Sequence, residues 1–275
     1  MALGLALDGK VALVTGGSRG IGAETVRLLR AAGARVAFSY HKARKQADAL
    51  VEECGGAAGT LGDFDCVAIE QELSAPVDGR TLVQSVVAVM GRLDILVANH
   101  GVWVAEDVPI AQMDEAQWRH TLAVNLDAVF GLTQAAVAQF ELQSCTACIS
   151  PSDQGEAAGH IVLISSTAGQ RGEAYHADYA VTKGALISLT KSLSTELAPK
   201  GIRVNCVAPG WVATDMTAAT LADPVTGPKI ALGAPLGRVA TPREIAGPIV
   251  FLCTPLAGFI SGEVLNVNGG AVLIG

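Results

Sequence analysis

Short runs of aliphatic and β-branched residues alternate along the chain with longer, alanine-rich stretches in which apolar positions recur every three or four residues. The short runs are hydrophobic at successive positions, which is typical of strands buried on both faces of a parallel sheet. Strands are therefore predicted at residues 10–15, 35–39, 67–71, 94–98, 160–165, 203–208 and 264–267.

Helix-length segments lie between these runs, among them residues 22–32, 81–90, 115–139 and 175–197. Strand alternating with helix implies right-handed crossovers. We expect an α/β fold, a single-domain doubly wound Rossmann-type parallel sheet over residues 1–275 with helices on both faces. Ligands bind such a sheet outside the carboxyl ends of its strands. Two insertions, near 54–66 and 143–159, precede strands, so we expect surface or assembly features at the opposite end.

Composition excludes several classes of protein. The net charge of -7 argues against nucleic acid or an anionic membrane as the main partner. The first ten residues lack a signal-peptide pattern and no apolar run approaches the ~20 residues that span a bilayer, so a cytoplasmic protein is expected. The six cysteines are expected to be reduced, and Cys145 and Cys148 lack a second pair or a histidine for a metal site. No metal is expected.

A glycine-rich turn follows the first predicted strand and opens a helix. Glycine allows the backbone to approach a pyrophosphate, and the helix N-terminus stabilises its charge. Because the turn stands in the context that such a motif requires, we predict a dinucleotide site here. The residues assigned to it are Gly16, Ser18, Arg19, Gly20, Ile21 and Gly22.

The end of the second predicted strand bears on the choice of nucleotide. NAD enzymes usually place an acid here to hold the ribose 2′-hydroxyl, but no acid occurs between Glu24 and Asp48. A carboxylate would repel a 2′-phosphate, whereas hydroxyl and basic side chains can bind one. NADP(H) is therefore the preferred cofactor, with NAD(H) possible. The candidate residues are Ser39, Tyr40, His41, Lys42 and Arg44, together with Arg19.

Tyr179 and Lys183 stand four residues apart in a predicted helix, so they share one face. A neighbouring ammonium is expected to lower the pKa of the tyrosine from its usual value near 10. The phenol then exchanges a proton with the oxygen of a ketone or an alcohol. Ser166, at the end of a strand, is expected to donate a hydrogen bond to the same oxygen. Ser166 and Tyr179 are thus the predicted substrate-binding residues.

These motifs resemble the classical short-chain dehydrogenase/reductase family over nearly the whole chain, and most of all its 3-oxoacyl-acyl-carrier-protein reductases. The resemblance implies a catalytic set of Asn125, Ser166, Tyr179 and Lys183, with Asn125 holding a water in a proton relay. It implies a homotetramer with contacts through 115–139 and 175–197. It also implies further cofactor contacts at Glu72, Asn99, Gly101, Tyr179, Lys183, Pro209, Gly210, Val212 and Thr214.

The chain departs from the family pattern at His100, where alanine is usual, and at Glu72, where aspartate is usual. No lysine or arginine occurs from 120 to 170, although acyl carrier protein is strongly acidic, and Lys200 offers one contact at most. A free carbonyl compound is therefore the more plausible substrate. Pocket residues are less readable. Trp103, Gln170, Tyr175 and Trp211 could line a pocket or be core or interface residues, and 216–235 resembles a mobile lid.

The leading interpretation is an NADPH-dependent carbonyl reductase. Two alternatives use the same residues: an NAD-linked alcohol, sugar or steroid dehydrogenase, and a 3-oxoacyl-acyl-carrier-protein reductase. A non-enzymatic alternative is a dinucleotide-binding regulator, which would need the glycine loop but no proton donor. The presence of Ser166, Tyr179 and Lys183 together favours an enzyme.

Overall fold

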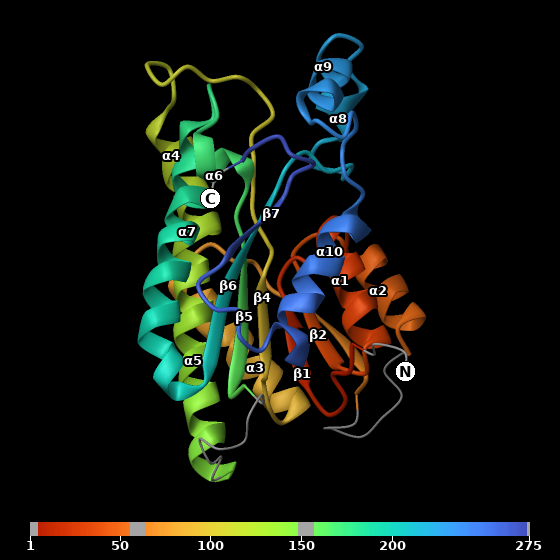
Figure 1. Ribbon diagram of the computed structural model, residues 1–275, viewed down its shortest axis with the longest axis vertical. Coiled ribbons are helices and arrows are strands. Elements are labelled where there is room, and N and C mark those ends of the chain that lie inside the picture. Colours follow the sequence, from red (N-terminus) through yellow and green to blue (C-terminus); the bar gives the residue numbers. More distant parts are fainter. Residues whose placement is uncertain (1–4, 56–63, 148–156, 274–275) are drawn as a thin grey trace.

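The computed structural model describes residues 5–55, 64–147 and 157–273. Seven parallel strands form one sheet in the order β3-β2-β1-β4-β5-β6-β7 (Figure 1). The predicted fold class is therefore confirmed, and each strand lies within two residues of its predicted bounds. The strands are β1 Val11–Val14, β2 Arg35–Tyr40, β3 Cys66–Glu70, β4 Ile95–Ala98, β5 Gly159–Ile164, β6 Ile202–Pro209 and β7 Val264–Val267.

The sheet is buried on both faces, as its continuous hydrophobicity predicts. Successive side chains of a strand point to opposite faces, so Ala12 and Val14 join one core while Val11 and Leu13 join the other. All four are fully buried. Both faces therefore need helical cover.

The helices cover the two faces in separate layers (Figure 1). α1, α2 and α10 cover one core, and α3, α5 and α7 cover the other. The helices of the body of the protein are α1 Gly20–Ala31, α2 Arg44–Glu53, α3 Pro76–Met90, α4 Glu115–Leu122, α5 Ala128–Ala147, α7 Ala177–Leu197 and α10 Pro242–Leu252. The other described α-helices are α6 Thr167–Arg171, α8 Ala218–Ala222 and α9 Thr226–Gly233.

Two segments differ from the predicted elements. Residues 115–139 do not form one uniform α-helix, because a π-helix, η1 Ala123–Asp127, separates α4 from α5. The predicted lid at 216–235 contains α8 and α9, which stand above the body of the sheet (Figure 1). Most of both predicted insertions lies outside the described residues, as does Cys148.

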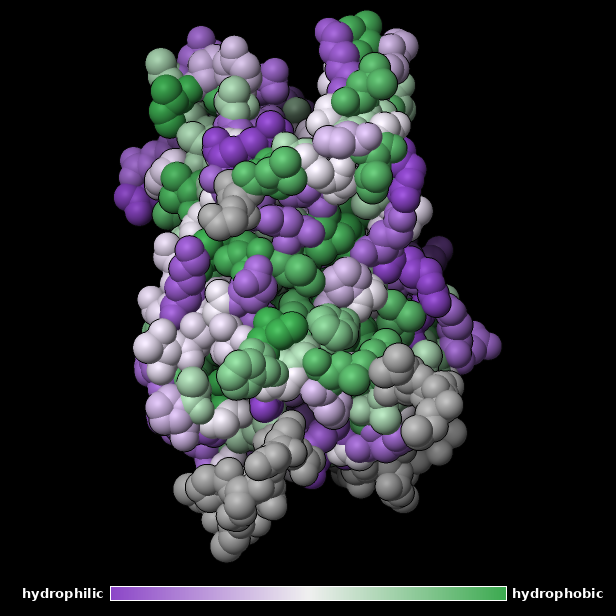
Figure 2. All heavy atoms as spheres, in the orientation of Figure 1, coloured by the Kyte–Doolittle hydropathy of each residue, from purple (hydrophilic) through white to green (hydrophobic). Residues whose placement is uncertain are grey.

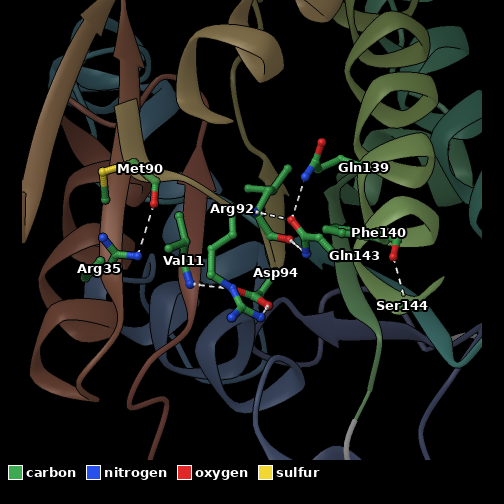
Figure 3. A network of polar contacts seen from close by, with 10 residues as sticks. Val11, Arg35, Met90, Arg92, Asp94, Gln139, Phe140, Gln143 and Ser144 are labelled. Atoms are coloured by element: carbon green, nitrogen blue, oxygen red, sulfur yellow. Dashed lines mark hydrogen bonds and ion pairs between the residues drawn. The ribbon is translucent and has the colours of Figure 1, made fainter. Parts of the chain in front are cut away.

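A polar network fixes the amino ends of β1 and β4 (Figure 3). The Asp94 carboxylate accepts hydrogen bonds from the Val11 N–H at 2.8 Å and from Arg92. Gln143 of α5 accepts from the Leu93 N–H at 2.9 Å and donates to its carbonyl at 2.7 Å. Buried polar groups are costly unless they are paired, so these bonds fix α5 against the end of the sheet away from the expected ligand.

The segment Glu115–Ser144 is long and apolar enough to cross a membrane by length and composition. Its buried residues Ala128, Leu132, Ala136 and Phe140 pack into the core that α3 shares with the sheet. We therefore interpret it as a helix of the hydrophobic core.

The strand order reverses between β1 and β4. The strands β2 and β3 lie on one side of β1, and the strands β4 to β7 lie on its other side. Such a switch point leaves a crevice at the carboxyl ends of the strands. Figure 2 shows a hollow at this end, between the side formed by α4 and α6 and the side formed by α8 and α9. In the same view, apolar side chains gather over the middle of the molecule, where β7 and α10 lie (Figure 2).

Candidate active site

The glycine-rich turn connects β1 to α1 and leaves the start of α1 open. The residue before the helix, Arg19, has no side-chain hydrogen bond to cap it, so the first N–H groups of α1 are free to bind an anion. Gly16 has φ +63°, a conformation that other residues rarely adopt. A Cβ on Gly22 would lie 2.3 Å from the Gly16 carbonyl oxygen. The turn therefore fits a closely approaching diphosphate.

A crevice of about 660 Å³ runs from this turn across the carboxyl ends of the strands. Gly22 does not line it, because this glycine packs beneath the turn against Gly16 and Asn99. The other residues assigned to the cofactor, apart from Arg44, line the crevice: Gly16, Ser18, Arg19, Gly20, Ile21, Ser39, Tyr40, His41, Lys42, Glu72, Asn99, Gly101, Tyr179, Lys183, Pro209, Gly210, Val212 and Thr214.

The end of β2 presents a mixed set of charges to the crevice. His41 and Lys42 line it, whereas Arg44 forms an ion pair with Glu70 at 3.5 Å and does not. The Tyr40 hydroxyl also donates to Glu70, at 3.2 Å. His41 lies 3.8 Å from Glu72. Of the basic residues that the sequence suggested for a 2′-phosphate, Arg19, His41 and Lys42 are in place and Arg44 is not.

Tyr179 and Lys183 lie on the same face of α7, and both side chains line the crevice. The Lys183 Nζ lies 5.6 Å from the centre of the Tyr179 ring and donates to the Ile164 carbonyl of β5 at 2.8 Å. Ser166 follows β5 and lies beside the Tyr179 phenol, with which it lines the crevice. α6 holds this serine in place, because its Oγ accepts from the Ala168 N–H at 3.1 Å.

The expected lowering of the tyrosine pKa is wrong for this arrangement. Burial raises the pKa of Tyr179 to about 12; the neighbouring Ser166 hydroxyl lowers it in part and the Glu173 carboxylate raises it further. Burial also lowers the pKa of Lys183 to about 8, so this side chain loses its positive charge more easily than the prediction assumed. At neutral pH the phenol is therefore protonated and able to donate.

Asn125 lies in the π-helix and is almost fully buried. Its side-chain oxygen accepts from the Val102 N–H at 2.8 Å, and its amide donates to the Val102 carbonyl at 2.9 Å and to Thr182 at 3.2 Å. These bonds fix the segment after β4 against α7. Because Val102 and Thr182 already occupy the side-chain amide of Asn125, the structure does not test whether this residue holds a water, and its relay role stays a prediction.

His100 has a structural role that sequence reasoning missed. Its Nδ1 accepts from the Thr15 hydroxyl at 2.8 Å, and its Nε2 donates to the Val124 carbonyl of the π-helix at 3.0 Å. The Thr15 oxygen in turn accepts from the Asn99 and His100 N–H groups, at 3.0 and 3.1 Å. Burial lowers the pKa of His100 to about 4, so the ring is neutral, as this pattern requires. Histidine in place of alanine was the signal, but only the fold shows its partners.

A second cavity, of about 390 Å³, meets the crevice at Ser166 and Tyr179, which line both. Trp103 and Trp211 form its aromatic wall, edge to face with ring centres 5.7 Å apart. Of the other pocket candidates, Gln170 instead hydrogen-bonds to Asn266, and Tyr175 is half exposed and lines neither cavity. Two of the four candidates, Trp103 and Trp211, therefore line the cavity, and the other two do not.

Comparison with known proteins settles the family. A family model described as "Enoyl-(Acyl carrier protein) reductase" matches residues 16–272. A 3-oxoacyl-[acyl-carrier-protein] reductase of Synechocystis sp. is 35% identical over 98% of this chain and 99% of its own. The chain is a short-chain dehydrogenase/reductase. This short-chain dehydrogenase/reductase is accordingly an oxidoreductase that acts on CH–OH or carbonyl groups.

Solved structures of family members superimpose closely on this short-chain dehydrogenase/reductase. A dehydrogenase/reductase from Sinorhizobium meliloti 1021 aligns with a TM-score of 0.83 and 32% identity over 98% of both chains. A blue fluorescent protein from a metagenomic library, in complex with NADPH, aligns with a TM-score of 0.82 and 33% identity, covering 97% of this chain and 99% of the other.

Proposed function

We propose that this protein is a cytoplasmic NADPH-dependent carbonyl reductase whose substrate is a small, free ketone or aldehyde. The observation that carries the proposal is the position of Tyr179 and Ser166, which line both the nucleotide crevice and the aromatic cavity. A carbonyl carbon in the aromatic cavity would face the crevice while its oxygen lies between the two hydroxyl groups.

The residues of the crevice suit a nicotinamide dinucleotide. The open start of α1 would hold the diphosphate, and Arg19, His41 and Lys42 would hold a 2′-phosphate. Lys183, on the same face of α7 as Tyr179, lines the part of the crevice where the nicotinamide end would lie, whereas Asn99 lies against the glycine turn. When bound, the nucleotide supplies a hydride equivalent to the carbonyl carbon.

The protein's own part in the reaction is to polarise the carbonyl and to supply a proton. The Ser166 hydroxyl donates a hydrogen bond to the carbonyl oxygen, which stabilises the negative charge that develops there. The Tyr179 phenol gives its proton to the same oxygen as the alcohol forms. A pKa of about 12 keeps this proton on the phenol at neutral pH, so the phenol can donate it to the carbonyl oxygen.

Two surface basic residues that an acidic carrier protein could bind are already paired, which favours a free substrate over one bound to acyl carrier protein. Lys200, the one basic contact that the sequence offered, is paired with Glu141, and Arg119 is paired with Glu115. An acidic carrier protein would have to break such pairs to dock. The runner-up remains a 3-oxoacyl-acyl-carrier-protein reductase, because the Synechocystis relative bears that name.

The test compares the wild type with Tyr179→Phe and with Tyr175→Phe. The second variant is a control, because it also removes a tyrosine hydroxyl but from a residue outside both cavities. Oxidation of NADPH is followed with a panel of ketones, aldehydes and 3-oxoacyl thioesters, free and carrier-bound. We expect Tyr179→Phe to lose turnover but to bind NADPH, and the control to keep both. Wild-type turnover by Tyr179→Phe would refute the role of this residue, and a preference for carrier-bound thioesters would establish the runner-up.

Nucleotide preference is tested by titrating the wild type with NADPH and NADH. We expect tighter binding of NADPH, and a larger loss of NADPH than of NADH affinity in Lys42→Ala. Equal affinities in the wild type would show that the end of β2 does not select a 2′-phosphate and would favour the NAD-linked alternative.

We also propose a homotetramer that uses the outer faces of α5 and α7. Phe130 and Val181 on these helices are about half exposed, and Leu142 is 64% exposed. Apolar side chains of this size on a surface are typical of an interface. Light scattering after gel filtration should give four times the chain mass of 28.1 kDa, and a monomer would refute the assembly.

A further inference from the structure

Two cysteines meet where α2 ends and β3 begins. Cys54 is the residue after α2, and Cys66 is the first residue of β3. Cys66 belongs to the core cluster of α1, α2 and β2, Cys54 packs against that cluster, and each thiol shifts the pKa of the other, so the two side chains are neighbours. Both are free thiols in the structure. Neither belongs to the crevice or to the aromatic cavity.

Arg30 of α1 holds the segments of the two cysteines side by side. Its Nε donates to the Cys54 carbonyl at 3.2 Å, and its guanidinium forms an ion pair with Asp65, the neighbour of Cys66, at 3.2 Å. Backbone pairing to Val36 of β2 fixes Cys66 from the other side. The closeness of the two thiols is therefore set by α1, β2 and the ends of the two elements that carry the cysteines.

The two thiols differ in exposure and in acidity. Cys54 is half-buried and open to small solutes, whereas Cys66 is fully buried. The neighbouring Cys66 thiol and the nearby Arg27 and Arg30 lower the pKa of Cys54, while the Cys54 thiol and burial raise the pKa of Cys66. Thiolate is the reactive form of cysteine. This order suits Cys54 as the first thiol to react and Cys66 as the second.

We propose that Cys54 and Cys66 form an oxidation site that closes to an intramolecular disulfide in the presence of a peroxide. The Cys54 thiolate attacks one peroxide oxygen, the O–O bond breaks, and the other oxygen leaves as hydroxide and becomes water. The Cys66 sulfur then attacks the sulfenic sulfur of Cys54, the S–S bond forms, and the hydroxyl leaves as water with the proton of Cys66. Two thiols are oxidised and one peroxide is reduced to two waters.

The disulfide would join α2 to the edge of the sheet. Among the described residues β3 pairs with one strand, β2, so strand pairing holds it on one side. Closing the chain between residues 54 and 66 constrains the unfolded state and adds a covalent tie to this edge strand. Because β3 begins far from the carboxyl-end crevice, the site acts on stability and leaves turnover largely unchanged.

The sequence makes the product easy to identify in the full-length protein. No lysine or arginine occurs from 46 to 79, so both cysteines fall in one tryptic peptide, 46–80. Cys145 and Cys148 share a different peptide, 120–171, while Cys206 and Cys253 fall in two others. Protein treated with one equivalent of hydrogen peroxide is blocked with iodoacetamide, digested and analysed by mass spectrometry. Cleavage before Asp63 and Asp65 then separates the two cysteines unless a disulfide joins them.

We expect peptide 46–80 to lose two hydrogens and both alkylation sites before the other peptides react, and to recover them with dithiothreitol. The melting temperature should rise by several degrees in the oxidised wild type. Cys66→Ala should stop at a Cys54 sulfenic acid that dimedone traps, whereas Cys54→Ser should leave Cys66 reduced.

Three outcomes would overturn the proposal. The first is a doubly alkylated peptide 46–80 after the peroxide has been consumed. The second is a sulfinic acid at Cys54 with no link to Cys66. The third is dimedone labelling of Cys66 in Cys54→Ser, which would reverse the order of the two thiols.

Discussion

The burial of Lys183 has a consequence for stability that can be measured apart from activity. Its side chain is only 5% exposed, and burial lowers its pKa from the usual 10.5 to about 8. Holding the ammonium in this environment costs the folded protein roughly 3 kcal/mol at neutral pH. The hydrogen bond to the Ile164 carbonyl offsets part of that cost. The perturbation is Lys183→Met, which removes the charge and keeps the length of the side chain.

The sign follows from proton linkage. Between pH 8 and 10.5 the unfolded chain holds a proton on Lys183 that the folded protein has lost, so stability from this group rises with pH. Relative to Lys183→Met, the wild type should gain about 1 kcal/mol in free energy of unfolding from pH 7 to pH 9. At pH 7 itself the difference is small, because the variant leaves the Ile164 carbonyl without its donor.

The assay is urea denaturation followed by tryptophan fluorescence at pH 7, 8 and 9, with reducing agent and one protein concentration throughout. Lys191→Met, which removes an exposed lysine from the same helix, is the control and should track the wild type at every pH. Other groups that titrate in this range, the cysteines among them, are common to all three proteins and cancel in the difference. A difference between wild type and Lys183→Met that stays flat or falls with pH would refute the reasoning.

Three further substitutions test the site. His100→Ala removes the hydrogen bonds to Thr15 and the Val124 carbonyl, and should lower the free energy of unfolding by about 1–3 kcal/mol and weaken NADPH binding. His100→Gln can donate to the same carbonyl and should recover part of the stability and part of the affinity. An unchanged denaturation curve for His100→Ala would contradict the structural role of His100. Gly22→Ala places a Cβ 2.3 Å from a backbone oxygen and should lower nucleotide affinity at least roughly tenfold, whereas Gly233→Ala, in open space on α9, should leave it unchanged in the same titration. Trp103→Ala should raise KM for the carbonyl compound without altering the dissociation constant for NADPH, because this residue lines only the aromatic cavity; equal losses of both affinities would contradict the separation of the two cavities.

The success of sequence reasoning differed between the two kinds of site residue. The glycine turn and the pair Tyr179 and Lys183 could be located because backbone freedom and helical spacing are local properties that the sequence displays directly. Pocket residues could be named only as one of two alternatives, since Trp103 and Trp211 stand far apart in the chain and meet only when β4 and β6 lie in one sheet. Arg44 illustrates the opposite error, because a basic residue of the right type is turned to Glu70 by a neighbouring strand.

Much of this protein was determined by its sequence alone. Continuous apolar runs separated by helix-length segments indicate a parallel sheet covered by helices, because that arrangement buries both sides of every strand. The tertiary structure alone decided the ionisation of the site and the partners of its side chains. Burial is a property of the whole fold, and it raises the pKa of Tyr179 where a nearby lysine had suggested the reverse. In the same way, only the fold brings His100 to the π-helix and Cys54 to Cys66, because these contacts depend on how the elements pack against one another.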